Sequence, residues 1–185
     1  MGWIIKANNY IFDELKYDFK NYVIFSFIRN PYNRAISSYE FIKNKKFDDR
    51  IPDELKNMSF KDFFINYENT VNIFIYTHSI MTQYENIKNT YNDIKVNYLC
   101  DYKKVDEELI KILQKINITD PYKHNELILN NLKINCSKKK NITDYYCEES
   151  LEIINRIFKK DFDFFNFKIY NNVDELNKFL LEYNN

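Results

Sequence analysis

The sequence predicts an α/β domain, and three features support that fold class. Residues 21–28 (NYVIFSFI) form a short run of β-branched and aromatic residues with no polar face, which is typical of a buried strand in a parallel sheet. Pro31 follows in the first turn of an expected helix, with Asn30 as its N-cap. A length of 185 residues and a hydrophobic content of 45% suffice for one substantial core, so we expect a single domain over residues 1–185.

The expected helix after Pro31 separates apolar from polar side chains when successive residues are placed about 100° apart. Its apolar side consists of Tyr32, Ala35, Ile36, Tyr39 and Ile42. Its polar side consists of Asn30, Asn33, Arg34 and Ser37. Because a helix start also presents backbone N–H groups and the positive end of the helix dipole, this strand, turn and helix favour a phosphate or sulfate site. An ordinary amphipathic helix is the alternative.

Two arginines beside the predicted strand end point to the same chemistry. The chain has four arginines, at positions 29, 34, 50 and 156, so lysine is its usual cation. Arg29 and Arg34 stand five positions apart, where a planar, forked donor suits an anion better than a point charge does. Two unrelated surface arginines are the alternative.

Composition argues against several other classes of protein. The 27 basic and 27 acidic side chains cancel, which argues against nucleic acid or an anionic membrane surface as a partner. The cysteines at 100, 136 and 147 are odd in number and widely separated, so we expect a reducing compartment, no disulfide framework and no zinc site. No apolar run approaches the roughly 20 residues that span a bilayer. The expectation is a soluble, cytoplasmic chain.

The segment from Arg29 to Tyr39 (RNPYNRAISSY) resembles the 3′-phosphate-binding signature of sulfotransferases that use 3′-phosphoadenosine-5′-phosphosulfate (PAPS). The resemblance is to the carbohydrate-type family, which includes chondroitin and heparan sulfate sulfotransferases. In that family the first arginine and the serine eight residues later hold the 3′-phosphate, which implies this role for Arg29 and Ser37. Asn30 and Arg34 also match the pattern and are further candidates for the nucleotide site, although Arg34 fits a role in bracing the loop equally well.

Two further segments resemble the same family in the same order. Residues 98–109 (YLCDYKKVDEEL), which lead into a helical pattern of Leu109, Leu113 and Ile116, resemble its downstream strand and helix. Residues 144–165 resemble its closing helix, which ends in Asp-Phe-x-x-Phe at Asp161. The resemblance implies a three-layer, parallel-sheet α/β domain of the P-loop nucleotide-hydrolase type.

The sequence also departs from the family pattern. Relatives open with a strand and a glycine-containing loop that wraps the 5′-phosphosulfate, whereas Gly2 is the only glycine here. We therefore expect an N-terminally truncated domain without its first strand and phosphosulfate loop, in which residues 3–19 form a helix or loop. Relatives also commonly place a base before a glutamate where Asp101 and Lys103 stand in the opposite order. This reversal either preserves an ion pair or alters the acceptor cleft.

The family resemblance implies transfer of a sulfuryl group from PAPS to an acceptor hydroxyl, with a carbohydrate as the expected acceptor and no metal ion. The expected partners are PAPS and its product, 3′,5′-adenosine bisphosphate (PAP). The alternative is an inactive remnant or a nucleotide-binding module, which the missing glycine loop favours. A structural domain that binds nothing is the third hypothesis. An anchor upstream of Met1 would place the protein at the Golgi membrane, where relatives often act.

The remaining chemical candidates are two histidines and a lysine cluster. His78 falls where relatives place an acceptor-side loop, so it is a candidate catalytic base, with a structural histidine as the alternative. His124, in an expected loop after Pro121, is a second candidate. The lysines at 138–140 either contact the nucleotide or form a solvated charge run.

Two aromatic-rich sets at helical spacing are expected in the core, behind caps at Ser59 and Asn172. The first set is Phe60, Phe63, Phe64 and Tyr67, and the second is Leu176, Phe179, Leu180 and Tyr183.

Overall fold

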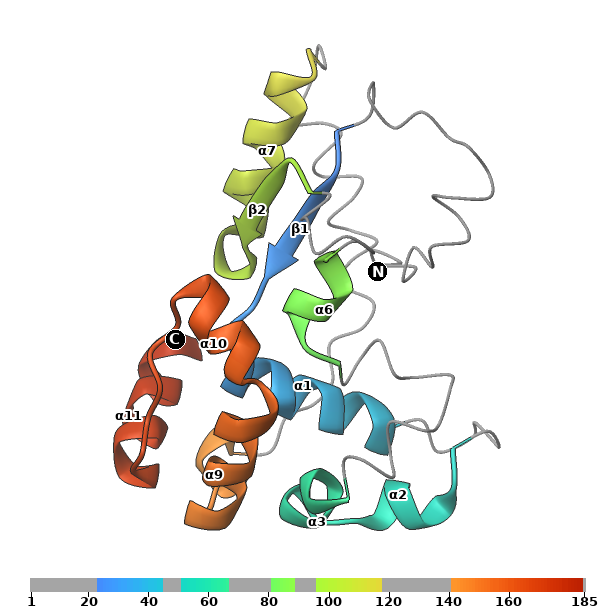
Figure 1. Ribbon diagram of the computed structural model, residues 1–185, viewed down its shortest axis with the longest axis vertical. Coiled ribbons are helices and arrows are strands. Elements are labelled where there is room, and N and C mark those ends of the chain that lie inside the picture. The colour runs from blue at the N-terminus through green and yellow to red at the C-terminus, as the bar shows by residue number, and fades with distance from the viewer. Residues whose placement is uncertain (1–22, 45–50, 67–80, 89–95, 118–140, 185) are drawn as a thin grey trace. The chain divides into compact units, whose positions relative to one another are not determined.

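The computed structural model describes residues 23–44, 51–66, 81–88, 96–117 and 141–184. These residues form a mixed α/β structure with a small parallel sheet and mostly helices (Figure 1). The α/β class is therefore confirmed, while the three-layer P-loop arrangement stays a prediction.

The chain groups into two compact units. The first, which we call the sheet unit, comprises Met1–Arg29 and Glu85–Cys136. The second, the helical unit, comprises Asn30–Tyr84 and Ser137–Asn185. The expectation of a single domain over residues 1–185 stays a prediction.

The sheet unit contains the two strands that the sequence predicts, one at residues 21–28 and one within residues 98–109. Strand β1 (Phe25–Ile28) pairs with β2 (Tyr98–Asp101) in parallel, and Ile28 lies opposite Asp101. The observed strand is shorter than the predicted one over residues 21–28, because pairing begins at Phe25. The 3₁₀ turn η3 (Tyr102–Lys104) follows β2 and leads into helix α7 (Val105–Lys115), which packs on β2 (Figure 1). The strand and helix expected from residues 98–109 are thus confirmed.

The buried residues of helix α7 differ from the predicted set at one position. Leu109 and Leu113 are buried as expected, but the third buried residue is Ile112 and not Ile116. Ile116 is the C-cap of α7 and is 39% exposed. The predicted pattern extended one residue past the helix, which ends at Lys115.

The helical unit packs several helices around one core. Its helices are α1 (Pro31–Lys43), α2 (Asp53–Asn57), α3 (Phe60–Ile65), η5 (Ile142–Asp144), α9 (Glu148–Ile157), α10 (Lys159–Phe165) and α11 (Val173–Asn184). The short helix α6 (Gln83–Ile87) begins in this unit with Gln83 and Tyr84. Its largest fully buried side chains are Tyr32, Ile36, Ile51, Phe63, Phe64, Leu151, Ile154, Phe158, Phe162, Leu176 and Leu180.

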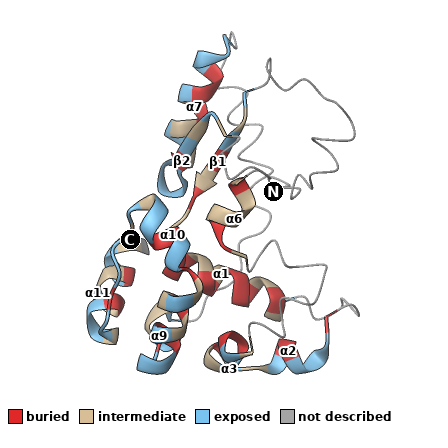
Figure 2. Ribbon diagram, in the orientation of Figure 1, coloured by how far each residue is buried: buried red, intermediate tan, exposed pale blue. Residues whose placement is uncertain are grey.

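Helix α1 is covered on more sides than the sequence predicts. The five residues of its predicted apolar side are all buried. Asn30 and Asn33, which we expected on a polar side, are also buried, at 4% and 1% exposure. Figure 2 shows that most of α1 is buried, because α2, α3 and α9 all pack against it. The less covered stripe of α1 consists of Arg34, Ser37 and Phe41.

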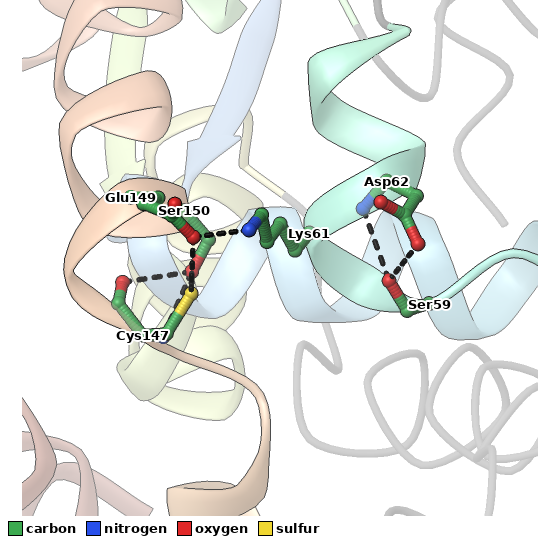
Figure 3. Close-up of polar contacts among 6 residues, drawn as sticks. All are labelled: Ser59, Lys61, Asp62, Cys147, Glu149 and Ser150. Atoms are coloured by element: carbon green, nitrogen blue, oxygen red, sulfur yellow. Dashed lines mark hydrogen bonds and ion pairs between the residues drawn. The ribbon is translucent and has the colours of Figure 1, made fainter.

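The predicted core and caps of the other helices are largely confirmed. Ser59 caps α3 by accepting the Asp62 N–H at 3.1 Å, and its hydroxyl donates to the Asp62 carboxylate at 2.6 Å (Figure 3). Asn172 caps α11 by accepting the Glu175 N–H at 3.0 Å. Of the two expected core sets, the buried members are Phe60, Phe63, Phe64, Leu176 and Leu180. Phe179 and Tyr183 are half-buried, and Tyr67 lies outside the described residues.

The expected closing helix consists of two helices. Helix α9 ends at Ile157, the fully buried Phe158 is its C-cap, and α10 begins at Lys159. The ion pair between Lys61 and Glu149 joins α3 to the first turn of α9 (Figure 3). Helices α9 and α10 both contribute buried residues to the core, among them Leu151, Ile154 and Phe162.

Candidate functional site

Arg29 lies at the carboxyl end of the parallel pair in the sheet unit. It directly follows β1, and Tyr102 directly follows β2, so the register brings both residues to the same edge. The guanidinium carbon of Arg29 is 4.7 Å from the centroid of the Tyr102 ring. This cation–π contact restricts the orientation of the arginine. In open α/β sheets, anionic ligands bind beyond this edge.

The Asp101 and Lys103 pair contributes structure at the same edge. The Asp101 carboxylate accepts the backbone N–H of Lys103 at 2.9 Å and so caps the η3 turn. This bond fixes the turn that carries Tyr102, the residue against which Arg29 packs. The side chain of Asp101 therefore forms a hydrogen bond with the backbone of Lys103.

In the helical unit, the start of α1 is built as the sequence predicts. Asn30 is the N-cap, and its side-chain oxygen accepts the Tyr32 N–H at 3.0 Å, while Pro31 occupies the first helical position. The first turn of α1 contains no acidic residue. Because carboxylates at this position would compete for the positive end of the helix dipole, their absence here suits an anionic ligand.

Ser37 and Asn33 stand one turn apart on α1, with polar groups that lack partners. The side-chain hydroxyl of the half-buried Ser37 makes no hydrogen bond within the described part of the chain. Both polar atoms of the Asn33 side chain, Nδ2 and Oδ1, are buried and likewise have no partner there. Residues four apart on a helix are neighbours on its surface. The described structure thus leaves the Ser37 hydroxyl and the buried Asn33 amide without hydrogen-bond partners.

Arg34 contacts the corner between α9 and α10. Its guanidinium carbon lies 5.7 Å from the centroid of the Phe158 ring. Its positive charge also acts on the nearby carboxylate of Asp161, whose pKa it lowers. Between ligand binding and bracing, the two roles that the sequence left open, these contacts favour bracing.

Asp161 itself is fully buried and joins α10 to the start of α6. Its carboxylate accepts the backbone N–H groups of Gln83 at 2.9 Å and of Tyr84 at 2.8 Å. Burial raises the pKa of Asp161, and these two hydrogen bonds oppose that rise, as does the charge of Arg34. Asp161 therefore joins its own helix to a segment that lies 77 and 78 positions earlier in the sequence.

The comparison with known families bears on the identity of this chain. The model of a family described as "Sulfotransferase family" matches residues 4–168, which is most of the chain. The chain belongs to the sulfotransferase family. No curated protein and no solved structure matches it. Family membership confirms the resemblance found in the sequence and supports sulfuryl transfer as the general class of chemistry.

The role of Asp161 in this sulfotransferase was not predicted from the sequence, which indicated the residue only as part of the closing segment. A signal was present, because Asp161 falls between Phe158 and Phe162 on a face that is otherwise apolar. A charged residue on a core face is rarely buried unless it is paired or hydrogen-bonded. An interpretation that had used this signal would have indicated a hydrogen-bonded carboxylate at Asp161.

Several predicted site residues of the sulfotransferase lie outside the described residues. They are His78, His124 and the lysines at 138–140. Among the residues that are described, no group of three or more His, Cys, Asp or Glu side chains is arranged to hold a metal ion. No helix in the same ranges is long and apolar enough to cross a membrane.

Proposed function

We propose that this protein binds PAPS and transfers its sulfuryl group to a hydroxyl of an acceptor, with a carbohydrate as the acceptor class. The observation that carries the proposal is the position of Arg29 at the carboxyl end of two parallel strands, oriented by Tyr102. Family membership supplies the reaction class. The sequence motif supplies the partner of Arg29, since Ser37 stands at the motif's serine position.

The residues of the motif fit the nucleotide. A guanidinium is the preferred donor to a phosphate because its N–H groups are rigidly forked. The Ser37 hydroxyl, which has no partner in the described residues, provides a further donor. We assign the 3′-phosphate to Arg29 and Ser37, and we assign Asn30 and Arg34 to the shape of the site, since Asn30 caps α1 and Arg34 contacts Phe158.

Bound PAPS would supply the activated sulfuryl group. The chain itself must hold the nucleotide in line with the acceptor oxygen, because alignment accounts for a large share of the rate in transfers of this kind. A general base must also take the proton of the acceptor hydroxyl as the oxygen attacks sulfur. His78 is the residue that we propose for this step, on its sequence position alone.

A second candidate function is nucleotide binding without transfer. The observation that favours it is the single glycine, Gly2, in 185 residues. A loop whose backbone N–H groups converge on an anion generally needs glycine. Incubation with PAPS labelled in its sulfur, together with a panel of glycan acceptors, separates the two. Labelled glycan indicates an enzyme, whereas binding of PAP without any labelled product indicates a binding module.

The nucleotide assignment is tested by thermal unfolding with PAP. A ligand present at 100 times its Kd stabilises the folded state by about 2.7 kcal/mol. For a chain of this size that corresponds to a rise in Tm of roughly 5–10 °C. We expect Arg29→Ala to abolish the rise and the exposed control Arg156→Ala to retain it. Adenosine 5′-monophosphate should have little effect, and equal stabilisation by both nucleotides would contradict recognition of the 3′-phosphate.

A further inference from the structure

Asn33 is a buried amide that the described structure leaves without hydrogen bonds. The residue is 1% exposed, and neither Nδ2 nor Oδ1 has a partner within the described ranges. Most buried polar side chains in proteins are hydrogen-bonded, because an unpaired buried group loses its hydration without compensation. An amide with both of its groups unpaired is therefore an exception that needs a physical explanation.

Two other buried polar side chains at α1, those of Asn30 and Glu40, are paired. The Asn30 side chain accepts the Tyr32 N–H, and the Glu40 carboxylate accepts the Tyr145 hydroxyl at 2.9 Å. The helix is thus not loosely packed in general. The exception occurs at the third residue of α1, within the turn whose N–H groups favour an anion.

The position of Asn33 relative to Ser37 indicates where a ligand would lie. The two residues are four apart and therefore adjacent on one face of the helix. Ser37 is the residue to which we assign the 3′-phosphate, so a molecule bound there extends within reach of its neighbour. Asn33 lies toward the N-terminus of α1 from Ser37.

The chemistry of the amide restricts which part of the ligand it meets. An asparagine side chain donates through its NH₂ group and accepts through its oxygen. An ionised phosphate oxygen only accepts, so it would leave Oδ1 unpaired. A ribose hydroxyl both donates and accepts, and the adenine edge offers an amino donor beside a ring-nitrogen acceptor.

We propose that Asn33 binds the nucleoside portion of the nucleotide whose 3′-phosphate Ser37 holds. The inference rests on the proposed function and adds a specificity residue to it. The side chain is held at the helix start without a partner and forms its hydrogen bonds with the nucleoside. Asn33 thus distinguishes a nucleotide from a simple phosphate or sulfate ion.

The test compares binding with stability in the full chain. Asn33→Leu keeps the approximate shape of the side chain and removes both polar groups, and Asn33→Ala serves as a second variant. Calorimetric titration with PAP should show affinity about tenfold weaker for both variants, as expected for the loss of a ligand hydrogen bond. The Tm of the free Asn33→Leu protein should equal or exceed that of the wild type, because no bond is lost in the free state.

The control is Asn177→Ala, which removes another buried, unpartnered side-chain oxygen in the helical unit and should leave PAP affinity unchanged.

Two PAP analogues identify the group that Asn33 contacts. The 2′-deoxy analogue lacks the ribose hydroxyl, and the inosine analogue lacks the adenine amino group. One of them should bind the wild type about tenfold more weakly than PAP, and its affinity should fall no further in Asn33→Leu.

Wild-type affinity for PAP in both Asn33 variants would overturn the inference, as would a free-state Tm for Asn33→Leu well below that of the wild type. If the wild-type chain binds no PAP at all, the proposed function fails; if Arg29→Ala alone abolishes binding, only the role of Asn33 fails.

Discussion

The hydroxyl of Tyr32 donates a hydrogen bond of 2.6 Å to the side-chain oxygen of Asn155, which lies 123 positions later in the sequence. Two further bonds close this connection into a ring. The Asn155 amide donates to the Tyr170 carbonyl at 2.8 Å, and the Tyr170 N–H donates back to the Tyr32 hydroxyl at 2.9 Å. The start of α1 is therefore fixed to α9 and to the chain before α11 by one fully satisfied network.

Removing that hydroxyl should destabilise the protein while preserving the ring packing. In Tyr32→Phe, the Tyr170 N–H and the Asn155 oxygen each lose a partner in a buried site. We expect the free energy of unfolding, measured by urea titration, to fall by about 1–3 kcal/mol. Tyr98→Phe is the matched control, because the Tyr98 hydroxyl has no hydrogen bond in the described chain. A loss of equal size in both variants would contradict a special role for the network.

The same tyrosine should give the protein a distinct response to alkaline pH. Burial raises the pKa of Tyr32 from 10.0 to about 12. Since the folded-state pKa exceeds the unfolded value, the stabilisation is fully present below pH 10 and is lost as the pH rises toward 12. The difference in unfolding free energy between wild type and Tyr32→Phe should therefore shrink between pH 10 and 12. A difference that stays constant over that range would show that Tyr32 does not ionise as proposed.

The buried carboxylate of Asp161 should be needed for the start of α6. Asp161→Asn replaces one acceptor oxygen by an NH₂ group that faces a backbone N–H. We expect a loss of about 1–3 kcal/mol in unfolding free energy and faster hydrogen exchange at Gln83 and Tyr84. The exposed Asp163→Asn, which breaks a surface ion pair with Lys159, should change stability by less than about 1 kcal/mol. Unchanged exchange at both amides in Asp161→Asn would contradict this role.

Asp161 also predicts a dependence on acidic pH. Burial raises the pKa of Asp161 above its ordinary value of 3.8, so the folded state binds the proton more tightly than the unfolded state does. Its contribution to stability is fully present below about pH 4 and declines as the pH rises through the raised pKa. Urea titrations from pH 4 to 7 should show that the wild type loses stability relative to Asp161→Asn as the pH rises. The opposite pH dependence would mean that the hydrogen bonds to Asp161 lower its pKa more than burial raises it.

Arg34 and Ser37 should separate into a bracing residue and a ligand residue. Arg34→Lys keeps the charge but loses the planar group beside Phe158, so we expect Tm and PAP affinity to fall together. Ser37→Ala should leave the stability of the free protein within about 0.5 kcal/mol, because the hydroxyl has no partner in the described residues. Its PAP affinity should fall roughly 5–10-fold. Thermal unfolding and calorimetric titration of each variant measure both quantities, and the reverse pattern would exchange the two roles.

Local sequence patterns predicted the elements that carry the site. Helix α1, its cap at Asn30 and its five buried apolar residues follow from capping preference and helical spacing, which act within a few residues. Strand β1 was predicted from its run of β-branched and aromatic residues, and β2 from the resemblance of residues 98–109 to the family's downstream strand. These features depend little on distant parts of the chain.

The remaining features depend on partners far away in sequence. The burial of Glu40 requires the Tyr145 hydroxyl, 105 positions later. A charged residue that sequence patterns would place on the surface therefore lies in the core. The contact between Arg29 and Tyr102 depends on strand register, which no local pattern specifies. The interruption at Phe158 was missed because the apolar spacing continues through it from α9 to α10.

The capping bond of Asn30 determines which residues the motif tolerates at this position. Its side-chain oxygen accepts the Tyr32 N–H, so the residue shapes the helix and its amide need not recognise the nucleotide. Ser and Thr supply the same acceptor with little loss, whereas Ala, Val and Leu do not. The sequence signature is therefore degenerate at its second position and restrictive at its first. A search pattern that demands asparagine there would overlook proteins with the same site.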